Sequence, residues 1–176
     1  MDTQSALLVP VPEAESLVGE WRSRYDSSAA MGVPAHISVL VPFIPPDQLT
    51  PEVELYLQAL SLDEAAFDFQ LTEVRRWPLV VYLAPEPRER FSSLIRAVVN
   101  VFPGYPPYGG IHEEVIPHLT VAECEREGAC DDPDAVLVEV ERAIAGVVPI
   151  EAHAREVWLM TGDGRWTLRR VFLFGG

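Results

Sequence analysis

The sequence predicts an α+β fold of two pseudo-symmetric lobes, each a small, mostly antiparallel sheet backed by helices, with a cleft between them. Helix-like and strand-like stretches alternate along the whole chain, as in mixed α and β domains. The same order of elements occurs twice, which indicates an internal duplication. With 176 residues, 48% of them apolar, the chain can bury a core without a metal or a disulfide.

The first half is expected to fold as strand, helix, strand, helix, strand, strand. Apolar and β-branched residues alternate or form short runs in the expected strands, which cover residues 6–11, 35–43, 67–72 and 79–84. One helix is expected to begin near Pro12, and the other after the capping pair Thr50-Pro51. Their predicted inward faces are Ala14, Leu17, Val18, Trp21 and Tyr25, and Val53, Tyr56, Leu57 and Leu60.

The second half is expected to repeat this order. Its first helix has an apolar stripe from Phe91 to Phe102, and its second begins at the capping pair Asp132-Pro133. A loop rich in Pro, Gly and Tyr separates the first helix from the next strand. The expected strands cover residues 116–122, 150–161 and 165–174. We therefore expect residues 1–176 to form one bilobal domain, with repeats at approximately 12–84 and 87–174.

The charge of the chain limits its partners. It has 27 acidic and 13 basic residues, a net charge of −14, and every basic residue is an arginine. Because neutralisation of phosphates supplies most non-specific affinity for nucleic acids, this charge argues against binding long duplexes. No apolar run reaches the about 18 residues of a membrane span, and the N-terminus lacks a basic signal-peptide region. We expect a cytoplasmic monomer that does not bind membranes.

The two cysteines, Cys124 and Cys130, do not have metal-site spacing. A disulfide between them is possible in principle. Because thiols normally stay reduced in the cytosol, we expect two reduced cysteines in a loop.

Two matching motifs on corresponding strands carry the chemistry. His36-Ile37-Ser38-Val39 lies in the first half and His118-Leu119-Thr120-Val121 lies in the second. Residues i and i+2 of a strand share a face, so each strand is expected to present an imidazole and a hydroxyl on one side and aliphatic side chains on the other. We predict that His36 and His118 face each other across the groove, with Ser38 and Thr120 beside them.

Paired motifs of this form, one in each lobe, resemble those of the two-histidine (2H) phosphoesterase superfamily. Its branches include bacterial 2′-5′ RNA ligase-like proteins and RNA 2′,3′-cyclic phosphodiesterases. The longer strings around the motifs, HISVLVPF and VIPHLTVA, and the string PPYGG before the second motif support the resemblance. It covers nearly the whole chain, and it implies a substrate with a 2′,3′-cyclic phosphate or a 2′-5′ linkage, on an RNA end or a small nucleotide.

The sequence departs from the family pattern at two places. Ser38 replaces the commoner Thr and keeps the hydroxyl donor. Ala122 and Glu123 follow the second motif, where the RNA cyclic phosphodiesterase branch commonly has a basic residue.

Two facing histidines suit in-line displacement at phosphorus without a metal or another cofactor. A neutral imidazole takes a proton from the attacking oxygen and a protonated one gives a proton to the leaving oxygen, because the ordinary pKa of histidine lies near neutrality. Ser38 and Thr120 can donate hydrogen bonds to the phosphate oxygens. The sequence alone leaves open which of His36 and His118 is the acid.

Other residues allow two interpretations each. Tyr82 and Tyr108 are candidates for binding the substrate by stacking, as is Tyr105, although such tyrosines often pack in cores or loops. Trp166 is a further stacking candidate for which core packing is the expected role. The doublets Arg75-Arg76 and Arg169-Arg170 could bind phosphate, although they are expected to lie on solvated faces.

Two other functions compete with a metal-independent phosphodiesterase. The first is a non-catalytic nucleotide-binding module that retains the cleft. The second is a metal-dependent hydrolase that uses His36, His112 and His118, although this spacing is not a recognised metal site.

Overall fold

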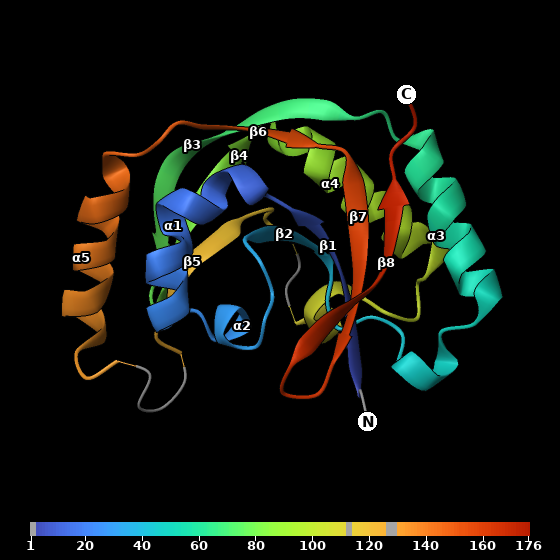
Figure 1. Ribbon diagram of the computed structural model, residues 1–176, viewed down its shortest axis with the longest axis horizontal. Helices are drawn as coiled ribbons and strands as arrows, with labels where there is room; N and C mark the ends of the chain where they lie inside the picture. Colours follow the sequence, from blue (N-terminus) through green and yellow to red (C-terminus); the bar gives the residue numbers. More distant parts are fainter. Residues whose placement is uncertain (1–2, 112–113, 126–129) are drawn as a thin grey trace.

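A computed structural model describes residues 3–111, 114–125 and 130–176, and in these ranges it has the expected α+β fold (Figure 1). The first half contains β1 (Gln4–Pro10), α1 (Pro12–Tyr25), α2 (Ser27–Ala30), β2 (His36–Leu40), η1 (Pro46–Gln48), α3 (Pro51–Asp63), β3 (Phe67–Trp77) and β4 (Val80–Glu86). The second half contains α4 (Arg88–Val101), η2 (Pro107–Gly110), β5 (Leu119–Glu123), α5 (Pro133–Ala145), β6 (Ile150–Ala154), β7 (Glu156–Gly162) and β8 (Trp166–Leu173).

The strands form two antiparallel sheets of four, which confirms the predicted two-lobed architecture. The first sheet has the order β2-β1-β7-β8 and the second has the order β5-β4-β3-β6. Each sheet therefore combines strands from both halves of the sequence. The strands that carry the two motifs, β2 and β5, are the edge strands of their sheets and contact each other. The fold thus brings two motifs 82 residues apart to the junction of the lobes (118 − 36 = 82).

The helices cover the sheets according to their apolar faces. The first helix, α1, packs on β5 and β6, and α5 packs on β3, β4 and β5. The helix α3 packs on β8 of the first sheet, and α4 contacts β2 and β4, one strand of each sheet. Figure 1 shows α5 and α3 at opposite ends of the molecule, with β2 and β5 between them. In the described part of the chain, no helix combines the length and the apolar character that a membrane crossing requires.

Three details differ from the sequence predictions. The expected strand over residues 150–161 is divided at Arg155 into β6 and β7, because the chain passes there from the second sheet to the first. Leu17 and Tyr56, placed on inward helix faces, are 41% and 51% exposed. In α1 the inward line runs instead through Ala14, Val18 and Arg22, which are spaced four residues apart on one face.

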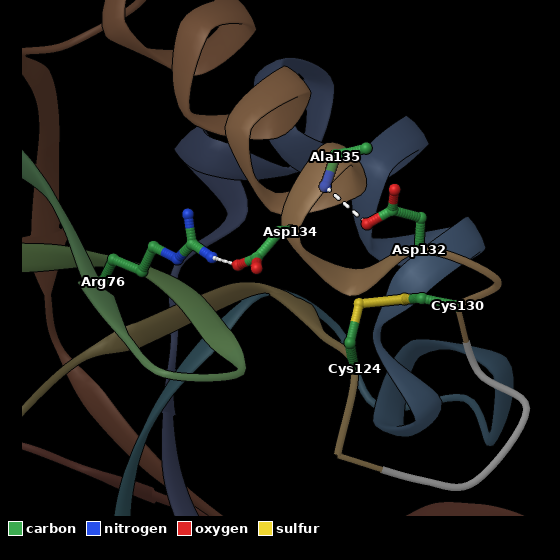
Figure 2. The surroundings of a disulfide bond; sticks show 6 residues. All are labelled: Arg76, Cys124, Cys130, Asp132, Asp134 and Ala135. Atoms are coloured by element: carbon green, nitrogen blue, oxygen red, sulfur yellow. Dashed lines mark hydrogen bonds and ion pairs between the residues drawn. A yellow bond between two sulfur atoms is a disulfide. The ribbon is translucent and has the colours of Figure 1, made fainter.

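The expectation of two reduced cysteines is wrong in this structure, because Cys124 and Cys130 form a disulfide (Figure 2). Cys124 follows β5, where its amide donates to the Leu79 carbonyl, and Cys130 precedes the Asp132 cap of α5. The two Cα atoms lie 5.6 Å apart, within the usual range for a disulfide. The prediction relied on the redox compartment, which carries no information about the distance between the two cysteines.

Candidate active site

Strand alternation places the motif side chains as predicted from the i, i+2 spacing. On β2, Ile37 and Val39 are buried in the core, whereas His36 and Ser38 are half-buried on the opposite face. The second motif has the same pattern, with Leu119 and Val121 buried and with His118 and Thr120 half-buried. Each strand therefore keeps an imidazole and a hydroxyl away from the aliphatic core.

The two imidazoles make matching hydrogen bonds to the backbone. Nδ1 of His36 lies 2.8 Å from the carbonyl oxygen of Pro34, and Nδ1 of His118 lies 2.7 Å from that of Ile116. In both cases the partner is two residues earlier in the chain. Because a carbonyl oxygen can only accept, each Nδ1 carries the hydrogen, and the proton that titrates is the one on Nε2.

The surroundings of His36 disfavour its charged form. Burial of the ring is the main cause and lowers its pKa from 6.5 to about 4. The positive charges of Arg22 and of protonated His118 lower this pKa further, while the Pro34 carbonyl and the Asp26 carboxylate oppose the effect. At neutral pH, His36 is therefore a neutral imidazole whose Nε2 carries a free lone pair.

His118 lies against two aromatic rings. Trp77 contacts it edge-on at a centroid distance of 4.7 Å, and Tyr82 contacts it at 5.5 Å. Trp77 and Tyr82 also pack against each other at 4.2 Å. Burial lowers the pKa of His118, and the hydrogen bond to the Ile116 carbonyl opposes this shift.

Tyr108 joins the first motif to the loop before the second. Its side chain is hydrogen-bonded to that of Ser38, and its backbone amide donates to the Val41 carbonyl at 2.6 Å. Tyr108 has a φ of 51°, a left-handed conformation that is uncommon outside glycine, and burial raises the pKa of its phenol. The loop therefore holds the Tyr108 ring beside the Ser38 hydroxyl.

Two pockets of different character adjoin the motifs. The pocket beside His36 and Ser38 is mainly apolar and includes Leu8, Met31, Val33 and Trp166. The other pocket, beside Ile116 and Pro117, is lined by Tyr82 and by charged side chains, among them Arg75, Arg88, Glu73, Glu86 and Glu89. The apolar pocket thus includes two residues of the first motif, and the charged pocket reaches Pro117, the neighbour of His118.

Comparison with known proteins gives the family. A model of the 2′-5′ RNA ligase superfamily matches residues 9–166. The chain belongs to the 2′-5′ RNA ligase superfamily. This confirms the resemblance to the 2H phosphoesterases that the paired motifs indicated. A search of curated protein sequences finds no match.

Solved structures of low sequence identity share the fold of this superfamily member. Escherichia coli LigT, in a crystal structure complexed with 3′-AMP, matches with a TM-score of 0.63 and 15% identity over 100% of both chains. TT0787 of Thermus thermophilus matches with a TM-score of 0.63 and 18% identity over 98% of both chains. The crystal structure of a phosphoesterase matches with a TM-score of 0.62 and 15% identity over 100% of both chains. These likenesses extend over the whole two-lobed fold.

Among the candidate residues, Tyr82 and Trp166 lie beside the motifs, and Tyr105 lies apart from them. Tyr82 is only 4% exposed, so it faces His118 and Trp77 more than solvent, and it is paired with Thr120 across β4 and β5. Trp166, for which core packing was expected, is half-buried and lines the apolar pocket. Tyr105 packs against Phe43 at 6.0 Å.

The other charged candidates have partners in the structure. Arg75 pairs with Glu73, Arg76 with Asp134, and both Arg169 and Arg170 with Glu54, whose pKa they lower. His153 pairs with Asp68 at 2.6 Å. His112, part of the metal hypothesis, lies outside the described residues. Within the described ranges, no three His, Cys, Asp or Glu side chains are grouped to hold a metal ion.

Sequence reasoning missed three residues that surround the histidines. Trp77 ends β3 and reaches His118, and Arg22 and Asp26 lie behind His36. A pattern search passes over Arg22 because a charged residue on a helix normally faces solvent. Its only signal is its place four residues after Val18 on the line of buried positions in α1.

Proposed function

We propose that this superfamily member is a metal-independent phosphoesterase that hydrolyses, or reversibly forms, 2′,3′-cyclic phosphate or 2′-5′ phosphodiester bonds. Its substrates are small nucleotides or RNA ends. The observation that carries the proposal is the matching pair of Nδ1 hydrogen bonds, to Pro34 and Ile116. Both leave Nε2 as the titrating atom on contacting edge strands. Two such atoms on opposite sides of a phosphate are what general acid–base catalysis of in-line displacement requires.

We assign the base to His36 and the acid to His118 in the hydrolytic direction. A pKa of about 4 keeps His36 neutral, so its Nε2 can accept the proton of the attacking water. As the water oxygen bonds to phosphorus, the bond from phosphorus to one ribose oxygen breaks. Nε2 of protonated His118 donates its proton to that oxygen. The negative charge of the bound phosphate favours protonation of His118 and offsets the effect of its burial.

The hydroxyls contribute to binding the phosphate. Ser38 and Thr120 share faces with His36 and His118, so each can donate to a non-bridging phosphate oxygen as charge builds up in the transition state. Tyr108 orients the Ser38 hydroxyl through their hydrogen bond. The apolar pocket at Trp166 suits a nucleobase, whose faces stack on aromatic side chains. Crystal structures of E. coli LigT complexed with 3′-AMP, ATP and NADP⁺ support a small nucleotide as the ligand class.

Turnover of the four nucleoside 2′,3′-cyclic phosphates by chelator-treated protein tests this proposal. We expect hydrolysis of at least one of them, at a rate that His36→Ala and His118→Ala each lower by on the order of 10²–10⁴. Binding of the nucleotides without turnover would refute the enzymatic function and favour the nucleotide-binding module. Activity that disappears with chelation and returns with a divalent cation would refute the metal-independent mechanism.

A further inference from the structure

A buried ion pair lies behind His36. Arg22 is 1% exposed and Asp26 is 4% exposed. Nε and Nη2 of Arg22 each lie 2.9 Å from Oδ2 of Asp26. The other carboxylate oxygen, Oδ1, accepts from the backbone amide and the hydroxyl of Ser28 at 2.9 and 2.7 Å. Arg22 is therefore held in one orientation by Asp26, which also caps α2.

Arg22 of this pair binds the segment just before His36, which contains the carbonyl that accepts from the His36 ring. Nη2 of Arg22 donates to the carbonyl oxygen of Val33 at 3.2 Å. The next carbonyl, that of Pro34, is the one that accepts from Nδ1 of His36. Glu15, also on α1, accepts from the amide of Ala35 at 2.7 Å. Side chains of α1 thus hold the segment on both sides of the Pro34 carbonyl.

The second half of the chain is built differently at the corresponding place. The helices α1 and α4 both have 14 residues, and Arg22 and Val98 occupy the same position counted from the helix starts. Val98 is 2% exposed, so an apolar residue fills this position in a helix of the same length. Around His118, the aromatic rings of Trp77 and Tyr82 make the contacts.

An arginine is a costly residue to bury. Its desolvation must be offset by well-placed partners, and buried ion pairs are often no more stabilising than apolar residues of similar size. Within the described part of the chain, Nη1 of Arg22 has no hydrogen-bond partner and lies 3.8 Å from Oε2 of Glu15. Stability alone is therefore a poor explanation for the burial of Arg22. Its hydrogen bond to the Val33 carbonyl, next to the Pro34 carbonyl that accepts from His36, suggests a role in placing His36.

We propose that Arg22, oriented by Asp26, is a positioning residue that holds the Pro34 carbonyl in place and thereby fixes the tautomer and orientation of the His36 imidazole. A displaced carbonyl would let the ring rotate or exchange its Nδ1 hydrogen for one on Nε2. That exchange would remove the basic lone pair from the reacting side. The consequence for catalysis rests on the proposed function, but the tautomer of His36 can be measured without any substrate.

The charges around His36 have opposing effects on its titration. Arg22 and His118 disfavour the protonated ring, and Asp26 favours it. Glu15 is bonded to the Ala35 amide, and Glu123 accepts from Ser27 at 2.5 Å. Tyr108 is hydrogen-bonded to Ser38 on the same strand as His36. A variant that removes Arg22 and Asp26 together changes the geometry while leaving little net change in charge.

The test is the nitrogen NMR spectrum of the histidine rings, which distinguishes the two neutral tautomers and the cation. We compare the wild type with Arg22→Met/Asp26→Asn, which retains an oxygen to cap α2. Arg24→Met is the matched control, because Arg24 is an exposed residue of the same helix, paired with Glu20. We expect His36 to become a mixture of tautomers in the double variant, while His118 in the same spectrum keeps its hydrogen on Nδ1.

Measurement of kcat and KM for the same variants separates an effect on positioning from an effect on substrate binding. In the double variant, kcat should fall by on the order of 10-fold to 100-fold, as misplacement of a reacting group does, with little change in KM. A folded double variant whose His36 tautomer and kcat match those of the wild type would overturn the inference. So would the same changes in Arg24→Met.

If the double variant does not fold, a second variant tests whether Arg22 positions His36. Arg22→Lys keeps a cation beside Asp26 but cannot donate to Asp26, Ser28 and Val33 in the same fork geometry. It should shift the His36 tautomer towards a mixture, and an unchanged tautomer would overturn the inference. Should the wild-type protein hydrolyse no nucleotide, the proposed function fails, but the tautomer comparison still decides whether Arg22 positions His36.

Discussion

The indole of Trp77 lies edge-on to the imidazole of His118, with a centroid distance of 4.7 Å and an angle of 78° between the ring planes. Tyr82 contacts the same imidazole, so two aromatic rings pack against His118. Around His36 the nearby groups include the ion pair of Arg22 and Asp26. The two histidines have the same backbone hydrogen bond in different electrostatic surroundings, which is the physical basis of the different roles that we propose for them.

Removal of the indole should make His118 easier to protonate. Trp77→Leu leaves the Ile116 carbonyl in place but admits water to one side of the ring, and burial is the main cause of the lowered pKa. An NMR titration of the imidazole should therefore give a higher pKa for His118 than in the wild type. Trp21→Leu is the control, because Trp21 stacks on Tyr25 in α1, and it should leave the titration of His118 unchanged. A lower or unaltered pKa in Trp77→Leu would show that the indole does not desolvate His118.

Replacement of either motif histidine should lower the catalytic rate severely. His36→Ala and His118→Ala each remove one proton-transfer group and should lower kcat by on the order of 10²–10⁴. The double variant should lose less than the product of the single losses, because groups that act in one step are not additive. His153→Ala provides the control, since His153 pairs with Asp68 between β6 and β3 and should leave the rate nearly unchanged. Equal losses in all three single variants would contradict the proposed catalytic pair.

The folded protein should lose stability as the pH falls, partly because of His36. Its pKa is lowered from 6.5 to about 4 on folding, so the unfolded chain binds a proton more readily than the folded one. The contribution of His36 is fully present above about pH 6.5, declines as the pH falls and is lost below about pH 4. It amounts to about 3 kcal/mol.

Denaturant unfolding at pH 7 and at pH 4.5 measures this contribution. His36→Gln should lose less stability between the two pH values than the wild type does, because glutamine does not titrate. A wild-type stability that changes no more than that of His36→Gln would show that the pKa of His36 is not lowered by folding.

Much of the fold followed from the sequence because local patterns specify it. The alternation in HISV and HLTV predicted which side chains leave the core, since neighbouring residues of a strand point to opposite faces. The caps at Thr50 and Asp132 are present at the starts of α3 and α5, where their side chains accept from Val53 and Ala135.

The parts that could not be predicted depend on contacts between distant segments. Residues 150–161 have a continuous strand pattern, and only the positions of the two sheets divide them at Arg155. The burial of Arg22 depends on Asp26 and on the Val33 carbonyl, neither of which changes the local pattern of α1. The hydrogen bonds to Pro34 and Ile116 depend on where the backbone enters each strand, which residue types do not determine.

Long RNA should bind weakly and with little dependence on salt. The net charge is −14, and Glu123, which follows the second motif, accepts a hydrogen bond from Ser27. Arg75, Arg76, Arg169 and Arg170 are each paired with an acidic side chain, which reduces the positive charge that they offer to a phosphate chain. Since each phosphate that is neutralised adds to the slope of log affinity against log salt, the slope for a long single strand should be shallow.

Titration of a labelled oligonucleotide at several salt concentrations measures this slope, with a mononucleotide 2′,3′-cyclic phosphate as the reference ligand. A steep slope for the oligonucleotide would place many phosphates in contact with the protein and would contradict the assignment of small nucleotides or RNA ends as substrates.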